Sequence, residues 1–300
     1  MLSAFIIKFA VWVLPPLMLV MALAARVGQL NPPEPEIYFM QAGTNRPGMV
    51  ALDVSRNLFA HMNWKNPIRA AADWAWSPDS QHVVFKVTRN ISVDLMGMDA
   101  DGGNLHWLTQ DGRNNHAPVW SPDGAHIAFV SARDNNDDIY VVDADGTHAR
   151  RLTDNSDIDD APAWSPDGAQ IVFHSRRSGN NDVYVVNADG SHLRRLTDTP
   201  ELDSDPSFSP DGKQIAFISG RDGNYEVYRM NADGSNPERL TWTREFEFRP
   251  LWSPDGKRIL FEAMTTGSEV MTYMIYSDGG DLRRLTTIDM FLHDPLWRTP

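Results

Sequence analysis

Residues 162–197 read PAWSPDGAQIVFHSRRSGNNDVYVVNADGSHLRRLT, and this stretch decides the fold because it recurs along the chain. Its Ser-Pro-Asp motif returns at a constant spacing of 44 residues, with the serines at Ser77, Ser121, Ser165, Ser209 and Ser253. Asp-Gly and Leu-Thr pairs follow at the same spacing until the fifth repeat, where the step grows to 45. One residue is therefore inserted between Ser253 and Asp278. A fixed period of this length indicates a repeat architecture.

Each repeat predicts four short strands, which in the quoted copy span residues 162–164, 170–174, 182–187 and 193–197. The apolar residues alternate with period two, and the turns between the strands carry Pro-Asp-Gly and Asp-Gly. A repeat of about 40 to 45 residues with four strands cannot bury its own faces, and radial packing of such units as blades of a propeller does bury them.

The two ends of the chain predict one more blade. Residues 37–39 match 171–173, residues 50–53 match 184–187, and residues 294–297 copy the first strand of a repeat. Three N-terminal strands plus one C-terminal strand make a complete blade, which closes the ring and removes open sheet edges. We therefore expect an all-β, six-bladed propeller of four-stranded blades over residues 36–300, with a phenylalanine and a tryptophan series in its core.

The repeat unit Trp-Ser-Pro-Asp-Gly, Ile-x-Phe, Tyr-Val-Val-x-Ala-Asp-Gly and Arg-Arg-Leu-Thr resembles the repeat of TolB-type six-bladed propellers. The resemblance covers about Glu36 to Trp297. It implies an exported, non-enzymatic propeller that acts as a protein-binding or scaffold module in the cell envelope. TolB-type proteins carry an α/β domain before the propeller, and the 35 residues that precede the repeats here are too few to form it, so we expect the propeller alone.

The N-terminal segment differs in kind from the repeats. Residues 9–25 form an uncharged run between Lys8 and Arg26, which predicts a signal peptide or a retained membrane anchor over residues 1–27. Residues 28–35 follow as a Pro-rich linker. Either interpretation exports the propeller across the cytoplasmic membrane, to a periplasmic or other extracytoplasmic location, and the second also attaches it to the bilayer.

Composition narrows the function further. The chain has 27 Lys plus Arg against 40 Asp plus Glu, a net charge of −13, and no cysteine. An acidic chain without a basic cluster is repelled by phosphate backbones, which disfavours a nucleic-acid partner. The absence of thiols excludes disulfides, thiolate-bound zinc and a cysteine nucleophile. We expect a monomeric propeller with an envelope or membrane protein as its partner.

No catalytic motif is present, whether of serine hydrolases, zinc proteases or nucleotide-binding enzymes. Polar residues do converge where the innermost strands begin, at the mouth of the central channel. This channel-mouth set comprises Asp73, His116, Asp160, Asp205, Arg249, His293 and Asp294. It predicts either a hydrated channel or a funnel that holds a cation, water or a partner side chain.

The alternative function is a metal-dependent propeller hydrolase of the lactonase or phosphotriesterase kind, with calcium at the channel mouth. Such enzymes need a convergent set of oxygen ligands. Asp73, Asp205 and Asp294 hold three of six equivalent positions, but the other three hold Ala117, Ala161 and Arg249, which disfavours this alternative. We expect no catalytic residue, no metal and no cofactor, with calcium left open. A third alternative is sugar or polymer binding by the tryptophan-containing loops, but the sequence shows no repeated polar site that supports it.

A further repeat pairs an arginine with an acidic residue five positions later, and we interpret it as a structural brace. The arginines are Arg89, Arg133, Arg177 and Arg221, and the acids are Asp94, Asp138, Asp182 and Glu226. The fifth repeat breaks this pattern with Thr265 and Met271.

The loops that enter the blades, opposite the Pro-Asp-Gly turns, divide into an acidic and an apolar half. The acidic face comprises Asp157, Asp159, Asp160, Asp203 and Asp205. The apolar half comprises Trp64, Trp242, Phe246, Phe248, Met290, Phe291 and Leu292. Neighbouring exposed apolar loops mark a partner or membrane site, so we predict partner binding by the apolar half. The alternative is that these side chains fold inward and seal the closing blade.

Overall fold

The computed structural model describes residues 36–41, 48–53, 58–61, 71–89, 92–286 and 292–297, which all belong to the compact unit Pro35–Pro300. The predicted signal peptide or anchor and the Pro-rich linker lie outside the described residues. Within the described ranges, the chain has no helix with the length and apolar character needed to cross a bilayer.

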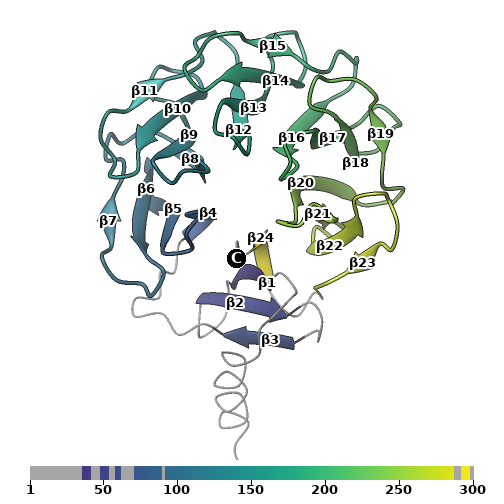
Figure 1. The fold of residues 1–300 in the computed structure, drawn as a ribbon, viewed down its shortest axis with the longest axis horizontal. Helices are drawn as coiled ribbons and strands as arrows, with labels where there is room; N and C mark the ends of the chain where they lie inside the picture. The colour runs from purple at the N-terminus through teal and green to yellow at the C-terminus, as the bar shows by residue number, and fades with distance from the viewer. Residues whose placement is uncertain are drawn as a thin grey trace, which may run out of the picture. The chain divides into compact units, whose positions relative to one another are not determined.

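One blade illustrates how the repeat folds. It consists of β12 (Asp159–Trp164), β13 (Gln170–Ser175), β14 (Asp182–Asn187) and β15 (Arg194–Arg195). These strands pair in sequence order as an antiparallel sheet. Figure 1 shows β12 nearest the centre of the ring and β15 at its outside. The two middle strands are buried on both faces because other blades pack against them.

Five blades are each built from four consecutive strands, in the same inner-to-outer order. Their remaining strands are β4 (Ala71–Trp76), β5 (His82–Arg89), β6 (Ser92–Asp99), β7 (His106–Trp107), β8 (Asn115–Trp120), β9 (His126–Ser131), β10 (Asp138–Asp143), β11 (Arg150–Arg151), β16 (Asp203–Phe208), β17 (Gln214–Ser219), β18 (Glu226–Asn231), β19 (Glu238–Arg239), β20 (Phe246–Trp252), β21 (Arg258–Met264), β22 (Val270–Tyr276) and β23 (Arg283–Arg284). An all-β propeller of four-stranded antiparallel blades is thus confirmed.

The two ends of the propeller pair in one further four-stranded sheet, in the order β24-β1-β2-β3. Its strands are β1 (Glu36–Gln41), β2 (Gly48–Asp53), β3 (Leu58–His61) and β24 (Leu292–Trp297). Five blades, and not six, therefore follow the simple pattern of four consecutive strands. The sheet that joins the two ends differs from them in connectivity, as the sequence matches at residues 37–39 and 294–297 predict.

The core is built from the repeated aromatic residues. The phenylalanines predicted for it, Phe85, Phe129, Phe173, Phe217 and Phe261, are all fully buried. In four blades the phenylalanine packs on a tyrosine of the next strand, with ring centroids 5.5–6.0 Å apart. At the turns, the Ser165 hydroxyl donates to Asp167 at 2.6 Å and accepts the Gln170 amide at 2.9 Å, while Gly168 adopts a φ of 70°. This bonding explains why Ser, Asp and Gly recur together.

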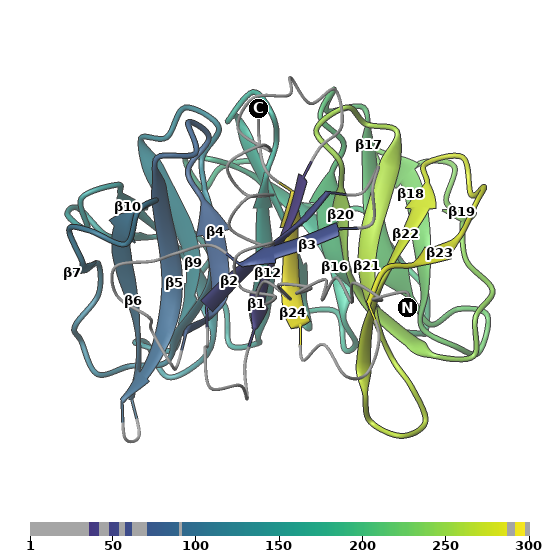
Figure 2. The same ribbon diagram turned by 90° about the horizontal axis from the view of Figure 1, so that it is seen from below.

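Two details of the strands differ from the prediction. The outermost strands of the five consecutive blades have only two residues each. In the β12–β15 blade, this is because Leu196 and Thr197 leave the regular ladder and both donate to the Val183 carbonyl. The inserted residue of the fifth repeat lies in the β21–β22 hairpin, since Phe261 pairs with Tyr273 where Phe217 pairs with Tyr228. This hairpin projects at the lower edge of the molecule in Figure 2.

The predicted arginine brace is correct only for Arg89, which donates to Asp94 at 2.8 Å. The other three arginines instead reach acids near the start of their own blade's inner strand. These pairs are Arg133–Asp111 at 3.1 Å, Arg177–Asp159 at 2.8 Å and Arg221–Asp203 at 3.2 Å. The sequence spacing was misleading because the hairpin between the middle strands carries the arginine back to the inner strand.

Candidate functional site

The innermost strand of each of the five blades is broken by a β-bulge. The ladders of β4, β8, β12, β16 and β20 all shift register near the middle of the strand. One residue at each bulge has a left-handed φ, between 44° and 53°: Asp73, Ala117, Ala161, Asp205 and Arg249. Bulges re-aim side chains and interrupt pairing. These residues stand 44 positions apart, so the repeat directs one residue per blade toward the channel.

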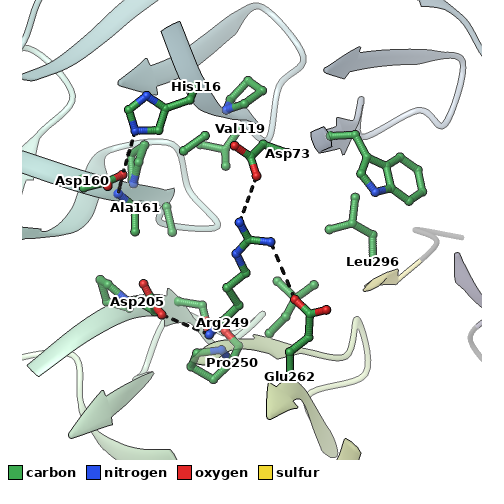
Figure 3. A pocket seen from close by; sticks show the side chains of 18 of the residues that line it. Asp73, His116, Val119, Asp160, Ala161, Asp205, Arg249, Pro250, Glu262 and Leu296 are labelled. Carbon is green, nitrogen blue, oxygen red and sulfur yellow. Dashed lines mark hydrogen bonds and ion pairs between the residues drawn. The ribbon is translucent and has the colours of Figure 1, made fainter. Parts of the chain in front are cut away.

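The bulges line a cavity of about 310 Å³. Five of the seven residues of the channel-mouth set surround it: Asp73, His116, Asp160, Asp205 and Arg249 (Figure 3). The side chains of His293 and Asp294 lie outside the described part of the structure. The cavity walls also include a proline from four of the five blades, at Pro118, Pro162, Pro206 and Pro250, and Pro295 from β24. The result is a polar centre with rigid apolar walls.

Arg249 is the hub of the charged side of this cavity. Its guanidinium donates to Asp73 at 2.9 Å and lies 3.7 Å from the Glu262 carboxylate, while its main-chain amide donates to Asp205 at 3.1 Å (Figure 3). Asp73 also accepts Lys86 at 2.5 Å. The Arg249 side chain remains half exposed. A half-exposed guanidinium in this position can still contact a carboxylate or carbonyl group that enters the channel.

A histidine–aspartate pair lies on the opposite wall. His116 Nε2 is 3.6 Å from Asp160 Oδ1, which also accepts the Ala161 amide at 2.6 Å. Burial opposes protonation of His116, but the interaction with Asp160 outweighs it and raises the histidine pKa. Burial likewise opposes ionisation of Asp160, yet the histidine holds the pKa of Asp160 below its usual value. The pair thus favours the charged state of both partners.

Sequence reasoning missed three charged or titratable residues around the channel: Lys86, His174 and Glu262. Each follows the buried phenylalanine of its blade, a position that holds Val130 and Ile218 in the other two blades. Glu262 lines the cavity, Lys86 bonds Asp73, and His174 Nδ1 accepts the Asp205 amide at 3.4 Å. These three residues could have been found from the sequence, because a charged or titratable residue in an otherwise apolar middle strand needs a polar environment.

The polar side chains that line the cavity mostly contact one another. Among the lining residues described, Ser207 is the one hydroxyl, and it is buried and donates to the Pro250 carbonyl at 2.7 Å. The carboxylates of Asp73, Asp160 and Glu262 each face a cation or a histidine. No group of three or more His, Cys, Asp or Glu side chains within the described ranges is arranged to hold a metal ion.

An exposed apolar patch lies where the inner strands begin. Phe246, Met264 and Val270 are successive cross-strand neighbours on β20, β21 and β22, with exposed fractions of 49%, 38% and 37%. Tyr225 packs on Phe246 with ring centroids 5.7 Å apart, and Trp242 is 68% exposed. We call these five residues the aromatic end patch.

The other residues predicted for partner binding are placed as follows. Phe248 is half-buried, and Leu292 belongs to β24 although its side chain lies outside the described residues. Trp64, Met290 and Phe291 also lie outside the described residues. Sequence reasoning missed Tyr225, Met264 and Val270, which lie on the hairpins between the middle strands and not on the loops that enter the blades.

The predicted acidic face is only partly exposed. Asp157 is exposed, while Asp160 and Asp205 line the cavity. Asp159 and Asp203 are fully buried and paired with Arg177 and Arg221. These two residues therefore contribute no charge to the surface, because they belong to the contacts between blades.

The match to a known family agrees with the architecture. Residues 32–159 and 154–297 match the model of the TolB beta propeller domain, so the chain belongs to this family. Comparison with curated proteins gave no match.

Solved structures share the fold at low sequence identity. TolB from Acinetobacter baumannii matches with a TM-score of 0.75 and 23% identity, over 94% of this chain and 71% of that one. A TolB-type protein from Agrobacterium tumefaciens matches with a TM-score of 0.68 and 23% identity, over 84% and 88% of the two chains. A chain of a nidogen/laminin complex matches with a TM-score of 0.66 and 16% identity, over 83% and 93%. Peptidases and a lyase also share the fold, so the fold alone does not decide between binding and catalysis.

Proposed function

We propose that this protein is an exported, non-enzymatic propeller that binds another protein of the cell envelope through the end of the blades where the inner strands begin. The observation that carries the proposal is the aromatic end patch, which exposes Trp242 together with the packed pair of Phe246 and Tyr225. Aromatic side chains are enriched among the residues that dominate protein–protein binding energy. Membership of the TolB propeller family and the likeness to TolB structures support the envelope location.

The channel mouth belongs to the same binding end. Arg249 lies three residues after Phe246 on β20, and the half-exposed guanidinium is available to a polar group of the partner. We propose no catalytic residue and no cofactor, since the carboxylates of Asp73 and Glu262 face Lys86 or Arg249 and that of Asp160 faces His116. Calcium remains an alternative to be tested by its effect on thermal stability, because a bound ion would raise the melting temperature.

We also propose that the β24-β1-β2-β3 sheet completes the ring as a sixth blade. Trp297 Nε1 donates to the Leu251 carbonyl at 3.2 Å, as Trp120 donates to Ala75 and Trp164 to Val119, each at 3.3 Å. The closing sheet thus contacts the preceding blade through the same bond that joins consecutive blades. A closed ring gives the partner a single rigid surface.

The test of the binding function is cross-linking in the native membranes, followed by mass spectrometry of the linked peptides. Trp242→Ser combined with Phe246→Ser should reduce links to the partner several-fold without a change in melting temperature. The matched control is Leu193→Ser, because Leu193 is similarly exposed but lies near the Asp-Gly turn of its blade. If the double variant keeps its links, or loses them only by unfolding, the patch is not the binding surface.

A further inference from the structure

Three of the contacts between successive blades each bury a pair of carboxylates, whereas the contact between the β4–β7 and β8–β11 blades buries Asp94 with Asn115. In those three contacts, one acid begins the third strand of a blade and the other begins the inner strand of the next blade. The pairs are Asp138 with Asp159, Asp182 with Asp203, and Glu226 with Glu247. All six residues are buried, with at most 2% of their surface exposed. Buried carboxylates are stable as ions only when cations neutralise them.

In two of these contacts, two arginines balance the two acids. Arg151 pairs with Asp138 at 2.5 Å and Arg177 with Asp159 at 2.8 Å. In the next contact, Arg195 pairs with Asp182 at 2.7 Å and Arg221 with Asp203 at 3.2 Å.

The contact between the β16–β19 and β20–β23 blades departs from this balance. Arg239 pairs with Glu226 at 2.8 Å, but Thr265 occupies the position equivalent to Arg221. Glu247 accepts hydrogen bonds from the Thr241 and Thr243 hydroxyls at 2.5 and 2.7 Å, and from the Val227 amide at 2.9 Å. Among the residues that the structure describes, no lysine or arginine forms an ion pair with it.

The blade in which Thr265 replaces the arginine keeps the two aromatic rings that such an arginine contacts in the other blades. Arg177 and Arg221 each lie over a phenylalanine–tyrosine pair, with the guanidinium carbon 5.0 Å from the tyrosine ring. The equivalent rings, Phe261 and Tyr273, stack at 5.5 Å, and Tyr273 is partly exposed. A carboxylate and an aromatic face together form the environment that guanidinium groups prefer.

We infer that Glu247 and the Phe261–Tyr273 pair form a seat for a guanidinium group supplied by a partner protein, so that an arginine side chain binds here in trans. The inference rests on the proposed partner-binding function and identifies a chemical feature of the partner. Glu247 directly follows Phe246, and Met264 directly precedes Thr265, so the seat adjoins the aromatic end patch. An arginine surrounded by exposed apolar side chains is a common arrangement at the centre of binding interfaces.

Charge and position favour this occupant. The protein carries a net charge of −13, which attracts a cationic segment. The described propeller begins at Glu36, which pairs with Asp53. The next residue, Ile37, pairs with Trp297 at the end of β24, and this end of the strand lies opposite to the aromatic end patch. The first described residue of the propeller thus lies at the end that carries the Pro-Asp-Gly turns, away from the seat.

The test uses N-acetyl-arginine amide as the probe and the neutral N-acetyl-citrulline amide as its control. Carboxyl-labelled glutamate, observed by NMR and assigned with Glu247→Gln, reports the pKa of Glu247. We expect millimolar arginine amide to lower this pKa saturably, by about one unit or more, because a nearby cation favours the carboxylate. Citrulline amide should not lower it.

Thr265→Arg should fill the seat within the chain, lower the Glu247 pKa without any probe and abolish the response to arginine amide. Thr266→Arg adds the same charge one position along the hairpin and should keep the response. Equal effects of arginine and citrulline amides, no effect of either, or a full response in folded Thr265→Arg protein would overturn the inference. If the seat fails while cross-links through the aromatic end patch persist, the proposed function still stands.

Discussion

Two contacts between blades each bury two carboxylates but differ in how many arginines neutralise them. The contact that contains Asp182 and Asp203 has two arginines, whereas the contact that contains Glu226 and Glu247 has one. The first lies between blades that repeat the sequence closely, and the second involves the blade that carries the inserted residue and the exposed apolar hairpin. The difference shows that a repeat can keep its strand pairing while one copy loses a stabilising side chain and extends its hairpin by one residue, and the binding role that we propose for this surface accounts for the loss.

The balanced contact should be the more sensitive of the two to mutation. Arg221→Met removes the cation from Asp203, which is fully buried, and also the cation–π contact with Tyr228. Breaking a buried ion pair by removing one partner costs about 3–5 kcal/mol. We expect a loss of that size in the free energy of unfolding, measured by urea denaturation at neutral pH.

The matched control is Thr265→Met, the same substitution at the equivalent position of the unbalanced contact. It removes no ion pair and only the two long hydrogen bonds that the Gly267 and Glu269 amides donate to the Thr265 hydroxyl, at 3.3 and 3.4 Å, so the unfolding free energy should change by no more than about 1 kcal/mol. Equal losses in the two variants would mean that the arginine does not stabilise its blade contact through the charge of Asp203.

The unbalanced contact should make stability depend on pH near neutrality. Burial, together with the nearby Glu226 charge, raises the pKa of Glu247 to about 7, against the hydrogen bonds from Thr241 and Thr243. The folded state then binds a proton more tightly than the unfolded state, whose pKa is the ordinary 4.5. This contribution to stability is complete below about pH 4.5 and is lost as the pH rises through 7. The shift corresponds to about 3 kcal/mol.

Urea denaturation of the wild type and of Glu247→Gln between pH 5 and 8 measures this dependence. The difference between the two proteins should fall steadily from pH 5 to about 7 and level off above pH 7, because glutamine does not titrate. Glu245→Gln is the control, since Glu245 lies on the same loop and is only partly buried. A difference that stays constant over this pH range would show that Glu247 is not the titrating group.

The repeats explain which features could be predicted from sequence. A period of 44 residues fixes the strands, the turns and the buried phenylalanines, because each copy must satisfy the same local geometry. The channel-mouth set followed from the same regularity, since bulges at Ala117, Ala161 and Asp205 lie one period apart.

Contacts between hairpins and inner strands could not be predicted in this way. Arg177 was assigned to Asp182, five residues away, but it pairs with Asp159, eighteen residues earlier, because the fold of the hairpin places the inner strand closer. Met264 and Val270 were missed for a related reason. They become a surface only through the cross-strand row with Phe246, which depends on the one-residue extension of the β21–β22 hairpin.

A smaller effect distinguishes the closing sheet from the contacts between consecutive blades. Trp164→Phe removes the hydrogen bond to the Val119 carbonyl, and Trp297→Phe removes the equivalent bond to Leu251. A single hydrogen bond of this kind contributes about 1 kcal/mol. If the closing sheet is a blade like the others, both variants should lose that amount in urea denaturation with one cooperative transition. A Trp297→Phe protein that is unchanged in stability, or that unfolds in two steps, would indicate that the two ends of the chain contribute less to the ring than the internal contacts do.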